Sequence, residues 1–159
     1  MSVRVAGLLV AEAVALLVLL AAAAAVASPD DMGRAGRALT VACGGVTESR
    51  SPWPGGFYGI PAVVSLAAAT AACGWALRRI AQRPGGEGER RTRSSAIVAA
   101  WGALVSAQLS GVGFTAAAAL RGTACVGTAG AVAGWVLWPL GLLAVVTFAW
   151  CLSAVAGRR

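Results

Sequence analysis

Four long apolar stretches dominate the chain and leave only short segments between them. They cover residues 3–27, 57–80, 95–120 and 126–156. Each is long enough to cross a hydrocarbon core of about 30 Å at about 1.5 Å per helical residue. The 159 residues therefore predict one all-α membrane domain, an antiparallel bundle of four transmembrane helices.

The composition agrees with this class and excludes several others. Hydrophobic residues make up 58% of the chain and charged residues 12%, unlike a soluble domain. The net charge of +7 comes from arginines that lie in the predicted loops, so we expect no nucleic-acid partner. Because the chain has no His and no nucleophile beside a base, we expect no catalytic residue, metal or cofactor. Abundant Ala, Gly, Val and Arg without Lys or Asn indicate a high-GC bacterium.

The first apolar stretch has two interpretations. Arg4, an apolar run and the small residues 25–27 resemble a cleavable secretory signal. However, the run is longer than the usual 7–15 residues of a signal core, and it contains Glu12. A retained transmembrane helix is the prediction.

The arginines predict how the bundle is oriented. Nine of them lie at the two termini and around the loop 81–94, whereas four lie in the other two loops. Cytoplasmic loops carry the excess of basic residues. We therefore expect both termini in the cytoplasm of a plasma (inner) membrane protein, with loop 28–56 on the outer side.

The four cysteines fall into two groups. Cys43 and Cys125 lie in the predicted outer loops, where an oxidising environment preserves disulfides, and we expect them to be bonded. Cys73 and Cys151 lie inside predicted spans as small apolar residues. The bond is interpreted as structural, with a redox-active pair as the alternative.

The outer loop has two halves of different composition. Residues 30–42 predict a short helix, and residues 47–60, rich in proline and glycine, predict irregular structure. Within the second half, Trp53, Phe57 and Tyr58 are expected at the level of the lipid headgroups.

Two polar residues interrupt the spans. Glu12 should face the bundle interior, because a carboxylate exposed to lipid has no compensating partner. Its candidate partners are Arg78, Arg79 and Gln108. Gln108 is the second polar candidate.

Residues 78–94 contain six arginines, two at the end of the second span and four in the loop 81–94. The loop lacks an apolar pattern, so it is predicted to be disordered, and its arginines should be attracted to an anionic leaflet. Ser94 or Ser95 would then cap the third span. Small residues at Gly102, Ser106 and Gly113 favour close helix packing.

Three functions follow from these patterns. The first is a non-enzymatic accessory or scaffold subunit that acts through helix faces or the outer loop. Its partner besides the bilayer would be another membrane protein or a second copy. The second is a small transport or ligand-binding subunit using Glu12 and Gln108. The third is a thiol–disulfide oxidoreductase using Cys43 and Cys125.

Overall fold

Four helices account for most of the computed structural model, which describes residues 3–82 and 86–157. All four are long and apolar enough to cross a membrane, as predicted. The helices are α1 (Val3–Ala25), α2 (Gly56–Gln82), α3 (Glu87–Arg121) and α4 (Gly127–Ala156), with a short 3₁₀ turn, η1 (Ala124–Val126), before α4.

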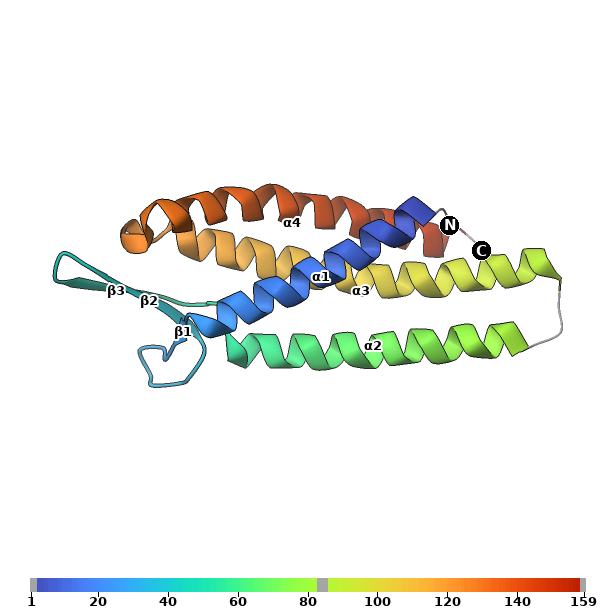
Figure 1. The fold of residues 1–159 in the computed structure, drawn as a ribbon, viewed down its shortest axis with the longest axis horizontal. Coiled ribbons are helices and arrows are strands. Elements are labelled where there is room, and N and C mark those ends of the chain that lie inside the picture. Colours follow the sequence, from blue (N-terminus) through green and yellow to red (C-terminus); the bar gives the residue numbers. More distant parts are fainter. Residues whose placement is uncertain (1–2, 83–85, 158–159) are drawn as a thin grey trace.

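Helix α3 lies at the centre of the bundle. It packs against the other three helices, most extensively against α4, while α1 crosses the bundle obliquely (Figure 1). Helix α2 is the least buried of the four. The middle of the core contains side chains from all four helices: Leu16, Leu20, Leu66, Val105, Leu109 and Ala144.

Small residues bring α3 close to its neighbours. A Cβ atom placed on Gly102 would lie 2.8 Å from both terminal carbons of Leu9 and 3.0 Å from the sulfur of Cys151. Gly113 lies directly against the backbone of Gly141 on α4. The small-residue stripe thus serves packing between helices of the same chain.

A three-stranded antiparallel sheet replaces the helix predicted for residues 30–42. Strands β1 (Ala27–Ser28), β2 (Ala38–Cys43) and β3 (Val46–Arg50) are joined in sequence order. The sheet projects beyond one end of the bundle, here called the hairpin end (Figure 1). The all-α expectation is therefore wrong for this segment.

The turn chemistry explains why this segment is not helical. Gly44 and Gly45 connect β2 to β3, and both have positive φ, at 55° and 81°. A two-residue turn of this kind matches the twist of paired strands. Leu39 and Val41 then alternate with Thr40, so that Leu39 is buried while Thr40 is exposed.

Two further expectations about irregular segments are corrected. Residues 47–60 contribute to β3 and to the start of α2, and α3 already begins at Glu87 within the predicted disordered loop. Glu87 and Glu89 occupy the first turn of α3, where negative charge is favourable, and Glu89 pairs with Arg93 at 2.6 Å. Residues 83–85 of that loop, and the arginines at 158 and 159, lie outside the described residues.

Ser95 consequently does not cap a helix start. It lies two turns inside α3, and its hydroxyl donates to the carbonyl of Arg91.

Candidate functional site

Three bonds fasten the β2–β3 hairpin to the turn between α3 and α4. Cys43 and Cys125 form the predicted disulfide, with Cα atoms 5.6 Å apart. Arg50 donates from Nη2 to the carbonyl of Gly122 at 2.6 Å. The carboxylate of Glu48 accepts the backbone N–H of Ala124 at 3.0 Å. The hairpin and the turn therefore form one connected unit.

The strand register assigns the tethering residues to one face of the hairpin. Val41 pairs with Glu48 and Leu39 with Arg50, and side chains of cross-strand partners point to the same face. Cys43 belongs to this face by the same alternation. The opposite face is exposed and consists of small residues: Thr40, Ala42, Thr47 and Ser49.

Trp53 lies inside the protein instead of at a headgroup surface. It is only 4% exposed, among Ala23, Leu39 and Ala116. Its indole N–H donates to the carbonyl of Ala23 at 2.8 Å. Because Ala23 lies in the last turn of α1, its carbonyl has no partner within that helix. Trp53 thereby connects the loop to the end of α1.

Phe57 and Tyr58 are exposed, as expected for surface aromatics, and both rings contact the guanidinium of Arg37. The guanidinium carbon of Arg37 lies 3.8 Å from the ring centre of Phe57 and 5.6 Å from that of Tyr58. The two rings meet edge to face at 5.0 Å. This contact holds the first turn of α2 against the loop.

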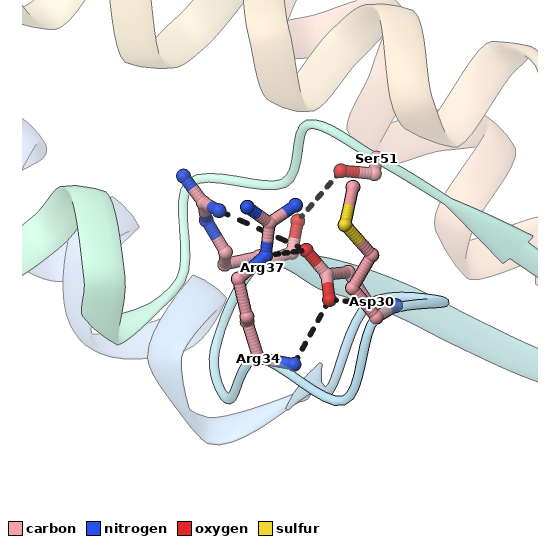
Figure 2. Close-up of polar contacts among 5 residues, drawn as sticks. Asp30, Arg34, Arg37 and Ser51 are labelled. Carbon is pink, nitrogen blue, oxygen red and sulfur yellow. Dashed lines mark hydrogen bonds and ion pairs between the residues drawn. The ribbon is translucent and has the colours of Figure 1, made fainter.

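Asp30 organises the loop that leads into β2 (Figure 2). Its carboxylate accepts the backbone N–H groups of Met32 and Arg34 and the Nε–H of Arg34, and it lies 3.8 Å from Arg37. Burial opposes ionisation, but the hydrogen bonds and charge of Arg34 outweigh it, and the pKa of Asp30 lies below its ordinary value. The carboxylate thus closes a turn over residues 30–34, where the sequence predicts a helix.

Glu12 is buried in the bundle, with 3% exposure, and its partner is Ser106. The Ser106 hydroxyl donates to Oε2 of Glu12 at 2.6 Å. Oε1 has no hydrogen-bond partner within the described part of the chain. The expected partners Arg78, Arg79 and Gln108 do not take this position; the guanidinium of Arg79 stacks on Trp75 instead.

Gln108 lies on a different side of α3. Its Nε2 donates to the hydroxyl of Ser65 on α2 at 2.7 Å, while Oε1 is buried without a donor among the described residues. Residues two positions apart on a helix point about 200° apart, so Ser106 and Gln108 face different neighbours. The structure does not bring Glu12 and Gln108 into one cleft.

A groove runs along α3 from Gln108 to the hairpin end; its inner part lies between α2 and α3 and its outer part between α3 and residues 50–52, and we call it the α2–α3 groove. It consists of two adjoining cavities of about 480 and 400 Å³ that share Pro52 and Thr115. Its mouth carries Arg50, and its wall includes Tyr58. The lining is mostly apolar.

The remaining candidates are also placed. Cys73 and Cys151 are unbonded, as predicted, and Cys151 is buried beside Leu9. Within residues 3–82 and 86–157, no three His, Cys, Asp or Glu side chains gather in a way that would hold a metal ion.

The sequence did not predict four residues that make these contacts: Glu48 and Arg50 of the hairpin, Ser65 beside Gln108, and Ser106 beside Glu12. Strand alternation on both sides of the Gly-Gly turn predicts that Glu48 and Arg50 share a face. No sequence signal pairs Ser65 with Gln108.

The chain matches no protein family, and comparison with curated proteins and with solved structures finds no similar sequence or fold.

Proposed function

We propose that the protein is a non-enzymatic accessory subunit in a membrane and that it presents its fastened hairpin to a partner protein. The observation that supports this most is the threefold attachment of the hairpin to the α3–α4 turn through Cys43, Glu48 and Arg50. A two-stranded hairpin is marginal by itself in water. Such attachment serves a surface that must keep its shape while it is recognised.

The helix surfaces favour insertion in a bilayer. Large apolar side chains point outward on α1, α2 and α4, for example Val18 at 63%, Val64 at 62% and Val146 at 67% exposure. In water such a surface would aggregate, whereas in lipid it is solvated. The bilayer is therefore the first partner of the protein in this proposal.

The proposed orientation places the hairpin outside the plasma membrane and both termini in the cytoplasm. The start of α1 and the end of α4 lie at the same end of the bundle, opposite the hairpin (Figure 1). The arginine excess belongs to that end. Impermeant labelling of tags at residues 1 and 159 tests this, and labelling of either tag in intact cells contradicts it.

Site-specific photocrosslinking in native membranes tests the accessory role. A photoreactive residue at Thr47, on the exposed hairpin face, should give one adduct of defined mass with a protein partner. The same group at Val63, on the exposed side of α2, is the matched control and should react with lipid. Cys125→Ser should reduce the Thr47 adduct, because it releases one attachment. Absence of a protein adduct from Thr47 would overturn the proposal.

A further inference from the structure

We infer that the α2–α3 groove binds one acyl chain of an anionic phospholipid, from the leaflet on the hairpin side, with the headgroup at Arg50. This goes beyond the accessory role, because it concerns a ligand of the bundle itself and requires no protein partner.

The length of the groove matches one leaflet. Its floor is a single stripe of α3 with residues spaced three or four apart, from Gln108 to Gly122. Fourteen residues at 1.5 Å each give about 21 Å. Half of a hydrocarbon core of about 30 Å is about 15 Å, so the groove reaches from the headgroup level through one leaflet.

The residues of the floor are small and leave room for an acyl chain. A Cβ atom placed on Gly111 would meet no other atom within 4 Å, so this part of the groove is open. Ala62 on α2 and Val112 on α3 provide apolar walls. This surface suits a hydrocarbon chain and disfavours a polar solute.

Two polar bonds close the inner end. Gln108 donates to Ser65, and further inward the indole N–H of Trp101 donates to the hydroxyl of Thr70 at 3.0 Å. Both bonds join α3 to α2, so Gln108 marks the end of the groove that lies farther from the hairpin.

The mouth is complementary to a phosphate. Arg50 is exposed, and one of its five N–H donors bonds to the carbonyl of Gly122. Planar guanidinium groups bind phosphate in pairs of hydrogen bonds. The nearby carboxylate of Glu48 is occupied by the N–H of Ala124. Tyr58 lies in the groove wall, where its hydroxyl is a second donor.

Photoactivatable lipids test this site. The full chain is reconstituted with a phosphatidylglycerol or a phosphatidylcholine analogue that carries the reactive group on the same acyl chain, and the adducts are mapped by mass spectrometry. We expect adducts in residues 107–118, about fivefold more with phosphatidylglycerol, the factor that one basic residue gives near anionic lipid.

Two variants and one control separate the site from general lipid contact. Gly111→Leu fills the groove and should reduce labelling of residues 107–118 to the level of the exposed α2 surface. Gly74→Leu, a glycine that also faces open space but lies outside the groove, should change nothing. Arg50→Gln should remove the preference between the two lipids.

The contrary results are equally defined. Equal labelling of residues 107–118 in wild type and Gly111→Leu, with the disulfide and helix content intact, overturns the groove as a lipid site. Equal labelling by both lipids in the wild type overturns the role of Arg50. Loss of labelling in Gly74→Leu as well as in Gly111→Leu overturns the location.

Discussion

Ser106→Ala should destabilise the bundle more than Glu12→Leu, although the two residues share one hydrogen bond. The Ser106 hydroxyl is the donor that the Glu12 carboxylate has in the described structure. Its removal leaves a buried carboxyl group without a partner, which costs about 1–3 kcal/mol.

Glu12→Leu should cost less, because the Ser106 hydroxyl can find another acceptor. A serine deprived of its acceptor can turn its hydroxyl to the carbonyl four residues earlier. Thr70, Thr115 and Thr147 all make such bonds in this protein. Leucine at position 12 also removes a carboxylate from apolar surroundings. We therefore expect Glu12→Leu to cost less than about 1 kcal/mol.

The double variant follows from the same argument. Once Glu12 is leucine, Ser106→Ala removes a hydroxyl that no longer serves the carboxylate. The cycle should then show a coupling of about 1–2 kcal/mol, which is above the average of about 0.6 kcal/mol for hydrogen bonds in membranes and near the largest value of about 1.7 kcal/mol.

Reversible unfolding in mixed micelles, followed by far-ultraviolet circular dichroism, measures these four free energies. Ser110→Ala is the matched control, because that hydroxyl bonds only to the carbonyl of Ala107 on its own helix. The reasoning fails if Ser106→Ala costs no more than Ser110→Ala, or if Glu12→Leu is the costlier of the pair.

Three further predictions concern the hairpin end. Cys43→Ser and Cys125→Ser should each abolish one intramolecular bond in non-reducing mass mapping and lower the unfolding free energy by up to roughly 4 kcal/mol, while Cys73→Ser leaves the bond intact. Trp53→Phe should cost about 1–3 kcal/mol in the same unfolding measurement, since it leaves an α1 carbonyl buried without a donor. Because the pKa of Asp30 is lowered by its hydrogen bonds, its contribution is complete at neutral pH and is lost as the pH falls through that lowered pKa. Protection of the amides in its turn, relative to their intrinsic exchange rate at each pH, should therefore fall in acid, and Asp30→Asn should remove this dependence.

The spans and the disulfide were predictable because each depends on a simple property of the chain. Long apolar runs specify helices in lipid whatever their neighbours are. Cys43 and Cys125 were paired by the compartment they share, and the structure confirms the bond. The interior position of Glu12 also followed from solvation alone.

The hairpin differs from the predicted helix because the helix signals of this segment serve a turn instead. Pro29 and the acidic pair that follows it suit a helix start, but the Asp30 carboxylate closes a turn instead. The contrary signal was present: two alternating segments separated by Gly44 and Gly45 are typical of a hairpin. The burial of Trp53 could not be predicted from the local sequence, because its hydrogen-bond acceptor lies 30 residues earlier on α1.

The partner of Glu12 could not be derived from spacing. Which residues of α3 face α1 depends on the crossing angle, and one residue of difference rotates the face by about 100°. The sequence favoured Gln108 on α3, whereas the packing of Leu9 against Gly102 brings Ser106 to Glu12.

The early start of α3 changes how its arginines meet a membrane surface. The eight residues before the predicted third span are helical from Glu87 onward, and they add about 12 Å of rigid rod. A flexible loop lays every arginine on anionic lipid, at about 1 kcal/mol each. On a rod, Arg90 and Arg91 point about 100° apart, so they meet the surface on different sides of the helix. Each arginine therefore meets the headgroups from a fixed height and in a fixed direction, which a flexible loop would not impose.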